Sequence, residues 1–384
     1  MELIEFGSIM SMTKGKKPRK QSKECTTGYF PYVDIKAFET GVIENYTDGE
    51  KCLPCNAGDI LIVCDGSRSG LVGKAINGYV GSTLAKISAK GMLTDYLFYF
   101  LQGQYALLNT KKKGTGTPHL NPELLKKQNV YVPSVEKQRR IISRIEELFS
   151  ELDKGVETLQ TIKQQLTVYR QAVLMEAFSS KDRCCRLKEI SKAISGYAFK
   201  SKKYTPNGEY VVVKIGNVKQ GYFDFSRDLT RTNEVDENIL SKFLLRRGDC
   251  LITLTGSRGK RDYGFVSTID EQTNFLLNQR VAALRFNKKI ALPEFYKYYL
   301  SSFDYRNQFF SYETGNVGQG NVGIKALTEP IVVCPTIEQQ RRIVNRIESR
   351  LSICDSIEQT VDKALTQAEA MRQSILKKAF EGKL

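Results

Sequence analysis

The sequence contains only one histidine, His119, among its 384 residues, and it lacks the common catalytic motifs. It has no G-x-x-x-x-G-K-[S/T] phosphate loop, no H-E-x-x-H zinc motif, no G-x-S-x-G nucleophile elbow and no Asn-Pro-Pro-aromatic motif of amino-methyltransferases. One histidine leaves little basis for a histidine-based triad or metal site. The sequence therefore favours a binding protein over an enzyme.

Signals for export and for membrane insertion are also missing. The first residues, MELIEFGSIM, lack the charged start and apolar run of a secretory signal, and no stretch reaches the ~18 apolar residues that a membrane span needs. The nine cysteines are an odd number in a long chain without such a signal, which favours free thiols in a reducing compartment. We expect a soluble, cytoplasmic protein.

The cysteine spacing gives weak support to a metal or redox site. Cys52 and Cys55 form a C-x-x-C pair, but a zinc site needs a second pair, and Cys25 and Cys64 are poorly spaced for it. The doublet Cys184-Cys185 lies in a predicted linker. We predict no metal site and assign no function to either pair.

The charge is strongly positive and indicates a class of partner. Lys and Arg number 58 against 42 Asp and Glu, a net charge of +16 that is spread along both halves of the chain. Such a field concentrates polyanions at the surface, so nucleic acid is a plausible partner. Because many soluble proteins are basic, charge alone leaves this open.

A long segment of the sequence is repeated. Aligned without gaps, residues 133–178 match residues 335–380 at 18 of 46 positions, including the paired motifs E-x-Q-R-R-I and a closing Ala-Phe. Chance would give two or three matches, so the chain carries an internal duplication. Each copy begins with proline, then Ser134 or Thr336, then Glu136 or Glu338, which is N-terminal capping chemistry.

Both copies have the apolar period of a coiled-coil seam. In the first copy the seam residues are Ile145, Leu148, Leu152, Leu159, Ile162, Leu166, Tyr169 and Val173, with a predicted break at Gly155. In the second they are Ile347, Ile357, Val361, Ala364, Ala368, Met371 and Ile375, with Arg350 and Cys354 also on the seam. The second seam is therefore expected to be the weaker.

A strand-rich segment precedes each helix. Predicted strands lie in GDILIVCDGSR (58–68), NVYVP (129–133), EYVVVKI (209–215), GDCLITLTGSR (248–258) and RVAALRF (280–286). These segments repeat faintly, through GD-x-L-I followed by Gly-Ser-Arg. The predicted order is a globular domain (1–132), a helix (133–180), a second globular domain (181–334) and a second helix (335–384).

This order constrains the topology. If the helices pair, the first leads away from one globular domain and the second leads back, so they are antiparallel with a domain at each end. We predict an α+β fold of two globular domains at opposite ends of an antiparallel two-helix coiled coil, with pseudo-two-fold symmetry from the duplication.

Two basic or glycine-rich segments recur at matching places in the two domains. Glycines let a backbone approach phosphate, cations hold the strand, and Asn, Gln, Arg and His pair with base edges. An ordinary solvated turn is the alternative for each residue. The predicted DNA-binding residues are Arg68, Lys111, Lys112, Lys113, Thr117 and His119 in the first domain and Arg258, Lys260, Arg261, Asn316, Gln319 and Asn321 in the second.

Two variable, strand-rich domains, each followed by a helix that begins P-[S/T]-[V/I]-E-x-Q-R-R-I and ends Ala-Phe, resemble the specificity subunit of a Type I DNA restriction–modification system. The resemblance covers the whole chain. It implies that each domain reads one half of a split, asymmetric DNA target, while the helices act as spacer and docking surface. It also implies two methyltransferase subunits that bind S-adenosylmethionine and methylate adenine, and it allows two restriction subunits. The chain itself would need no cofactor and catalyse nothing. The predicted docking residues are Gln138, Arg139, Arg140, Gln340, Arg341 and Arg342.

Two alternatives come from other classes. A stand-alone DNA nuclease or methyltransferase predicts cutting or S-adenosylmethionine binding by the purified chain. A coiled-coil scaffold unconnected with DNA predicts no binding to duplex even at low salt.

Overall fold

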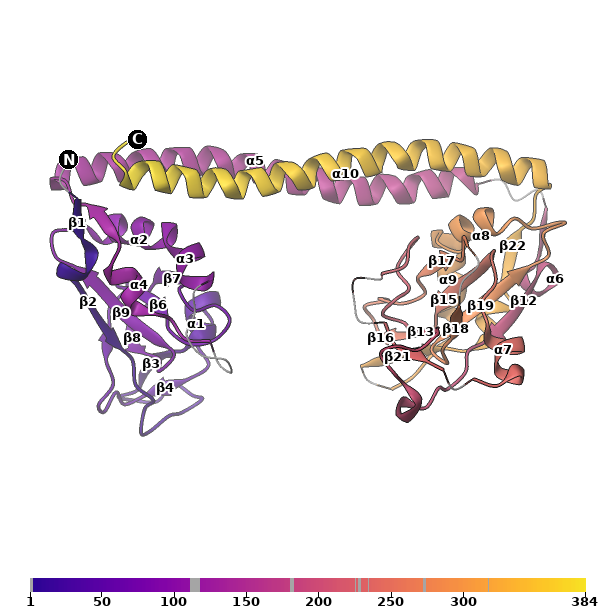
Figure 1. The fold of residues 1–384 in the computed structure, drawn as a ribbon, viewed down its shortest axis with the longest axis horizontal. Helices are drawn as coiled ribbons and strands as arrows, with labels where there is room; N and C mark the ends of the chain where they lie inside the picture. The colour runs from indigo at the N-terminus through magenta and orange to yellow at the C-terminus, as the bar shows by residue number, and fades with distance from the viewer. Residues whose placement is uncertain are drawn as a thin grey trace. The chain divides into compact units, whose positions relative to one another are not determined.

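The computed structural model describes residues 3–110, 118–179, 183–224, 226, 229–233, 235–271, 274–316 and 318–384. The chain forms two compact units, Met1–Gln160 with Asp362–Leu384, and Thr161–Val361. Each unit contains one globular part, called here the first head (described residues within 3–132) and the second head (described residues within 183–334). Two long helices, α5 (Val135–Ala177) and α10 (Ile337–Phe380), contribute one segment each to both units (Figure 1).

The first head combines a four-stranded antiparallel sheet with a smaller mixed sheet. The larger sheet has the order β2-β9-β6-β7, and the smaller has the order β4-β3-β8-β5 with β3 and β8 parallel. A two-stranded ribbon, β1 with β10, closes the head beside α5. The elements are β1 (Leu3–Glu5), η1 (Phe6–Ser8), β2 (Met10–Lys14), β3 (Phe30–Val33), α1 (Ile35–Thr40), β4 (Tyr46–Thr47), β5 (Pro54–Cys55), β6 (Ile60–Val63), β7 (Val72–Lys74), β8 (Gly78–Val80), β9 (Leu84–Ala89), α2 (Thr94–Gly103), α3 (Tyr105–Thr110), α4 (Pro122–Lys126) and β10 (Asn129–Tyr131).

The second head repeats this plan. Its larger sheet has the order β12-β19-β15-β17, which matches β2-β9-β6-β7 strand for strand, and β11 with β22 forms the closing ribbon. Two three-stranded sheets, β14-β13-β18 and β16-β21-β20, complete it. The elements are β11 (Cys184–Arg186), α6 (Leu187–Ile190), β12 (Ser191–Ser195), η2 (Ser201–Lys203), β13 (Tyr210–Val213), β14 (Arg231–Thr232), α7 (Glu237–Phe243), β15 (Asp249–Thr253), β16 (Thr255–Ser257), β17 (Val266–Thr268), β18 (Phe275–Leu277), β19 (Val281–Phe286), α8 (Pro293–Tyr299), α9 (Phe303–Ser311), β20 (Glu313–Thr314), β21 (Gln319–Val322), η3 (Ile324–Leu327) and β22 (Ile331–Val333).

The central strands are apolar on both faces because each separates two cores. Along β6, Ile60 and Ile62 face the core shared with the helices, whereas Leu61 and Val63 face the core shared with the smaller sheet. This alternation follows from the two-residue period of a strand. It explains why ILIV is an unbroken apolar run, and the five predicted strand segments are all confirmed by β6, β10, β13, β15 and β19.

The Ala-Phe pair at the end of each helix packs against a head. The Phe380 ring lies 4.9 Å from the Tyr96 ring and 5.5 Å from the Phe100 ring in the first unit. In the second unit the Phe178 ring lies 5.4 Å from the Phe295 ring and 5.1 Å from the Tyr299 ring. Edge-to-face pairs of this kind add specific geometry to the burial of apolar surface. The end of α10 therefore packs in the unit in which α5 begins, and the end of α5 packs in the unit in which α10 begins.

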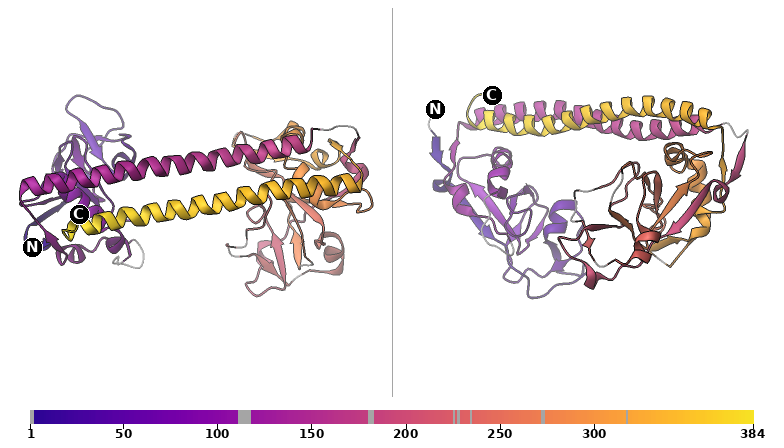
Figure 2. Two further views of the ribbon diagram at one scale, coloured as in Figure 1. Left: turned by 90° about the horizontal axis from the view of Figure 1, so that it is seen from above. Right: turned by 45° about the vertical axis from the view of Figure 1, so that its right-hand side comes forward.

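The helices run antiparallel and repeat one contact in each unit (Figure 2). In the second unit Arg170 pairs with Asp355 at 2.7 Å, and Glu176 pairs with Arg350 at 2.6 Å, so the numbering rises along α5 as it falls along α10. In the first unit Arg372 pairs with Asp153. Arg372 and Asp153 are the duplicates of Arg170 and Asp355, as expected for an internal two-fold relation.

The seam departs from its sequence prediction at Gly155 and at three flanking residues. Gly155 does not break α5, which is continuous through that position. Cys354 is buried in the seam. It belongs to a row of residues spaced seven apart, Ile347, Cys354, Val361 and Ala368, and all four side chains are buried. The flanking seam residues Tyr169, Ile357 and Met371 are exposed. In the corresponding row of α5, Leu152 and Leu159 are only half-buried.

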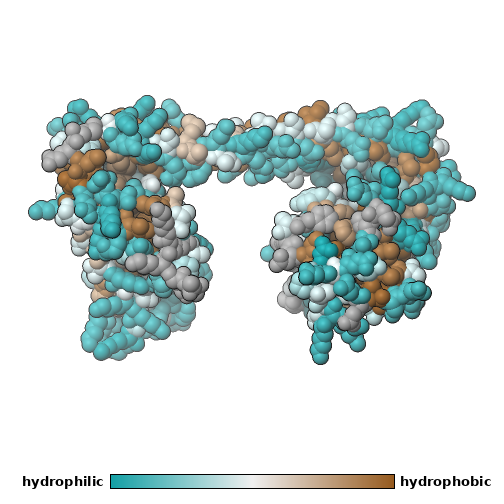
Figure 3. Space-filling model, in the orientation of Figure 1, coloured by the Kyte–Doolittle hydropathy of each residue, from teal (hydrophilic) through white to brown (hydrophobic). Residues whose placement is uncertain are grey.

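The visible surface of the helix pair is largely hydrophilic or intermediate in hydropathy (Figure 3). Among the described residues, no helix combines the length and apolar character that crossing a membrane requires.

Candidate nucleic-acid interface

In both heads the structure pairs the segment around the Gly-Ser-Arg motif with the later glycine-rich segment that carries His119 or Asn321. In the first head Asp65, the residue before Gly66-Ser67-Arg68, forms an antiparallel β-bridge with His119. In the second head β16 pairs with β21, so that Thr255 lies opposite Asn321 and Ser257 opposite Gln319. Because His119 and Asn321 are duplicates at the same offset, the two heads present equivalent edges. The recurrence of these motifs at matching places in the two domains thus has a structural counterpart.

The edge of the first head carries a charged cluster. The Asp65 carboxylate accepts a hydrogen bond from Lys14 Nζ at 2.8 Å and lies 2.7 Å from His119 Nδ1. Partial burial acts to raise the pKa of Asp65, but the hydrogen bonds from Lys14 and His119 outweigh it and hold this pKa below the usual carboxyl range. Asp65 therefore fixes two groups that can face a polyanion.

A cavity of about 510 Å³ lies beside this cluster, with Met10, Met12 and Leu120 among its lining. Arg68 is exposed and forms an ion pair with Glu39. The predicted residues Lys111, Lys112, Lys113 and Thr117 lie outside the described part of the chain, so their role stays a prediction.

The edge of the second head carries an ordered basic loop. The Asp262 carboxylate accepts hydrogen bonds from Ser257 N at 2.6 Å and from Ser257 Oγ at 2.9 Å, which lower the pKa of Asp262. Arg258 Nη1 donates to the carbonyl oxygen of Gly315 at 2.7 Å and so ties the loop to the neighbouring hairpin. Arg261 has the left-handed φ of 49° and lies 4.9 Å from the centre of the Phe310 ring. The loop is preorganised by contacts within the chain.

The predicted readers of the second head lie on the surface. Gln319 and Asn321 are exposed and alternate with buried Gly320 and Val322, so both side chains point away from the core on one face of β21. Asn316, Arg258, Lys260 and Arg261 are also exposed. Amides and guanidinium groups on one edge are the groups that pair with base edges in a major groove.

Sequence reasoning missed the residues that hold these loops. In the second head Arg306 of α9 donates to three carbonyl oxygens of the loop, those of Gly264 at 2.9 Å, Arg261 at 3.1 Å and Tyr263 at 3.3 Å. Burial, and next the charge of Arg261, lower the pKa of Arg306. No local pattern identifies Arg306, because its partners precede it by about forty residues in the chain.

The first head uses Asn109 of α3 in the same way. Its Nδ2 donates to the carbonyl oxygens of Ser67 at 3.0 Å and Ser69 at 3.2 Å. The loop it holds, 66–70, is four residues shorter than the corresponding loop, 256–264, of the second head. The extra residues include Lys260 and Arg261. The heads therefore share a scaffold and differ in the length and charge of the loop displayed on it.

The prediction that Gln138 and Gln340 dock a partner is wrong. Both side chains are fully buried. Gln138 bridges Leu93 N, Gly91 O and Pro133 O at 2.7, 2.7 and 2.9 Å. Gln340 makes the duplicate set of contacts in the second unit. These glutamines join each helix start to its head, and their burial leaves no surface for another subunit.

The remaining predicted docking residues are exposed. Arg139, Arg140, Arg341 and Arg342 lie on the solvent side of the first helical turns. Whether they contact a partner stays a prediction.

The C-x-x-C pair has no metal-binding neighbours in the described ranges, where no group of three or more potential ligands occurs. Cys55 is buried, and burial raises its pKa to about 11, which disfavours the thiolate.

Comparison with known families decides the class of the protein. The family model for the Type I restriction modification DNA specificity domain matches residues 1–167 and again residues 184–367. The chain belongs to this family. The two matches correspond to the two duplicated halves, each a head with most of the helix that follows it.

Curated relatives agree with the specificity-domain assignment. The chain is similar to the Type I restriction enzyme MjaVIII specificity subunit of Methanocaldococcus jannaschii, with 25% identity over 405 residues that cover 100% of this chain and 92% of the relative. It is also similar to the EcoBI specificity subunit of Escherichia coli, with 23% identity over 99% of this chain and 85% of that relative. As a specificity subunit, the chain is the non-catalytic component of its system.

Solved structures share the fold. A chain from a study of complex assembly and conformational transition of the type I R-M system matches with a TM-score of 0.72 at 19% identity, covering 100% of this chain and 98% of that one. The HsdS subunit from Thermoanaerobacter tengcongensis matches with a TM-score of 0.51 at 19% identity, covering 100% and 97%. The predicted α+β fold of two duplicated domains joined by paired helices is confirmed.

Proposed function

We propose that this specificity subunit reads a bipartite, asymmetric DNA target, with one half-site for each head. The observation that carries the proposal is the pair of equivalent edges with different side chains. At the bridged position the first head places Asp65 opposite His119, whereas the second places Thr255 opposite Asn321, whose side chain is exposed. Because base recognition depends on the donor and acceptor pattern displayed, the same backbone with different side chains reads a different sequence.

The edges have the two kinds of groups that DNA recognition needs. Lys and Arg side chains such as Lys14 and Lys260 suit phosphate oxygens and set position, whereas Asn321, Gln319 and Arg258 suit base edges and set sequence. The net charge of +16 supports association with a polyanion.

The proposed partners are two methyltransferase subunits, which carry S-adenosylmethionine and methylate adenine, with two restriction subunits as further members. Support comes from the duplicated helix starts, which expose the same arginines twice. An interface used once in each repeat accommodates two identical partners. The chain's own role is to select the sequence and bring the catalytic subunits to it.

The test is an exchange of the first head. Residues 1–132 are replaced by the matching domain of a relative with a known target, and the methylome of cells carrying the hybrid is sequenced. We expect one half of the methylated motif to change and the other half to stay. Cells with the unaltered chain, and cells without it, are the controls. A change in both halves, or in neither, would contradict the assignment of one half-site to each head.

A further inference from the structure

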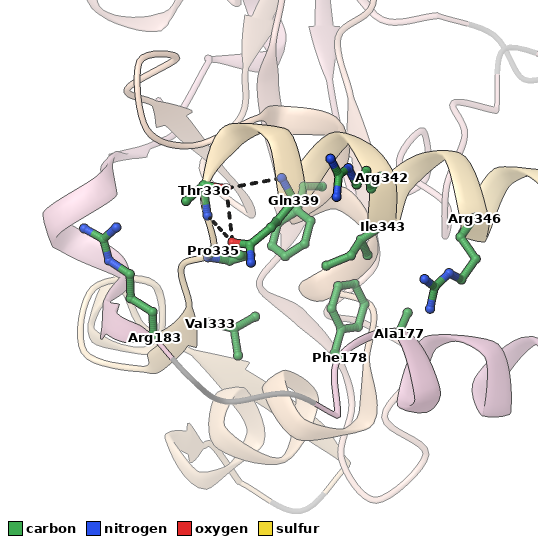
Figure 4. Close-up of a pocket in the computed structure, with 11 residues that line it drawn as sticks. Ala177, Phe178, Arg183, Val333, Pro335, Thr336, Gln339, Arg342, Ile343 and Arg346 are labelled. Carbon is green, nitrogen blue, oxygen red and sulfur yellow. Dashed lines mark hydrogen bonds between the residues drawn. The ribbon is translucent and has the colours of Figure 1, made fainter.

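A cavity of about 250 Å³ lies in the second unit, where the end of α5 meets the start of α10 (Figure 4). Its floor is apolar and comes from three elements: Phe178 at the end of α5, Phe295 of α8 and Val333 of β22. Ile343 of α10 faces Phe178 across the cavity in Figure 4. The floor belongs to the second head's core, so its shape is fixed by packing.

Three guanidinium groups surround this floor. Arg183, Arg342 and Arg346 line the cavity and are exposed. Arg342 pairs with Glu338, but both side chains are about three-quarters exposed, and an exposed pair of this kind contributes little. The side chains of Arg183 and Arg346 form no ion pair with any residue in the described ranges. Arg350 and, more weakly, Arg346 lower the pKa of the Glu176 carboxyl, so two guanidinium groups share this one carboxylate and the described rim keeps a net positive charge.

The helix N-terminus at the cavity is already capped. Gln339 N donates to Thr336 Oγ1 at 3.3 Å, and the Gln339 side chain accepts from Thr336 N at 2.9 Å, as the dashed lines in Figure 4 show. This reciprocal pair is a capping box. An incoming acidic group would therefore meet the arginines and not free helix amides.

The same residue types recur in the first unit. Arg140, Ile141 and Arg144 are the duplicates of Arg342, Ile343 and Arg346. They lie at the start of α5, in the unit where Ala379 and Phe380 repeat Ala177 and Phe178. Arg144 is exposed and pairs locally, with Glu147 at 2.7 Å. A partner present in two copies would meet similar chemistry at both places.

We propose that the cavity rimmed by Arg183, Arg342 and Arg346 binds an acidic segment of the methyltransferase subunit. Acidic side chains of that segment contact the guanidinium groups, and a neighbouring apolar side chain covers Phe178 and Val333. Guanidinium groups bind carboxylates through paired hydrogen bonds, and apolar anchors in shaped pockets contribute most of the energy of an interface. This inference rests on the proposed function, because it assumes that the methyltransferase is the partner.

A protein segment suits the cavity better than a DNA phosphate. A phosphate group needs cations but makes no use of a floor built from two phenylalanines and a valine. In Figure 1, β22 and the start of α10, which both contribute lining residues to the cavity, lie away from β16 and β21, the strands of the candidate DNA edge. The mixed character of the site, charged at the rim and apolar below, matches the anatomy of protein interfaces.

The first experiment removes the rim charges of Arg183 and Arg346. The double variant Arg183→Ala with Arg346→Ala is compared with a control that loses two exposed cations elsewhere in the second head, Lys192→Ala with Lys289→Ala. Affinity for the purified methyltransferase subunit is measured by calorimetry, and the copy number by native mass spectrometry. We expect affinity to fall at least about ten-fold in the cavity variant and by less than about two-fold in the control. Circular dichroism and a thermal melt check that both variants fold.

The outcomes separate the two hypotheses. If the unaltered chain binds no methyltransferase, the proposed partnership fails. If it binds normally and the cavity variant binds equally well, only the inference about the cavity fails. A variant that keeps its methyltransferase affinity but weakens duplex binding by the assembled complex would show that the arginines contact phosphate, which also overturns the inference.

A second experiment identifies the occupant directly. Arg342 is replaced by the photo-crosslinking residue benzoylphenylalanine, the complex is irradiated, and the crosslinked peptides are identified by mass spectrometry. We expect crosslinks to a methyltransferase segment that contains Asp or Glu beside an apolar residue. Crosslinks only to DNA, to a segment without acidic residues, or to no partner in an assembled complex would overturn the proposal.

Discussion

Gln340→Leu should destabilise the second unit by about 3 kcal/mol. The Gln340 side chain is fully buried. It accepts a hydrogen bond from Leu292 N at 2.8 Å and donates to Ile290 O at 2.9 Å and Pro335 O at 2.8 Å. Leucine fills a similar volume, so the substitution removes the three hydrogen bonds with little change in packing.

The magnitude follows from the groups left without partners. One backbone N–H and two carbonyl oxygens lose a buried partner, and each orphaned group costs about 1–3 kcal/mol, with carbonyls toward the low end because they have a second lone pair. A total of about 3 kcal/mol is a large part of the 5–15 kcal/mol typical of folded domains. Gln340→Glu should also destabilise, because its carboxylate still accepts from Leu292 N but faces two carbonyl oxygens without a proton to donate.

The assay combines urea unfolding with hydrogen exchange measured by mass spectrometry. We expect a lower unfolding midpoint and faster exchange in peptides around 290–300 and at the start of α10. Arg341→Leu is the matched control, since Arg341 is the exposed neighbour and surface substitutions change stability by less than about 0.5 kcal/mol. Gln138→Leu should produce the duplicate effect around 91–97 in the first unit.

Two results would refute this reasoning. A loss of less than about 0.5 kcal/mol in Gln340→Leu would mean that water or a shifted backbone satisfies the three groups. Equal loss of protection in both units after either substitution would mean that the contact does not act locally.

Three further predictions concern Gly155, Arg306 and the lysines at 111–113. Gly155→Ala should stabilise the chain by about 1 kcal/mol in urea unfolding, because alanine is the better helix former and the added Cβ meets no atom within 4 Å; a loss of stability would show that α5 is strained there. Arg306→Ala should make only one half of the methylated motif degenerate, because the loop that Arg306 holds belongs to the second head. Arg306→Lys should restore part of the specificity. An unchanged motif would show that the loop does not read DNA. Replacing Lys111, Lys112 and Lys113 by alanine should flatten the salt dependence of DNA binding by the assembled complex by up to about three units of slope, at about one unit for each phosphate contact; an unchanged slope would place these lysines away from the backbone.

Local patterns predicted the duplication, the two helices and the buried strands. The repeat is visible in the residues themselves, and the apolar period that marks α5 and α10 depends only on neighbours three to seven positions away. The same reasoning failed at Gly155, where a cost of about 1 kcal/mol is too small to interrupt a helix of 43 residues whose neighbours pack on a partner. It also failed at Tyr169 and Met371, which carry the correct period but are exposed.

Tertiary structure alone decided what the individual polar residues do. Gln138 and Arg139 are adjacent in a motif that occurs twice, yet one is buried against Gly91 and the other is exposed. Arg306 holds a loop more than forty residues before it, and Lys14 reaches Asp65 across 51 residues. A period along the chain specifies which face of an element is buried, because that depends on local geometry. The partner of a polar side chain depends on which distant segments the fold brings within about 3 Å, and that is set by the packing of the whole head.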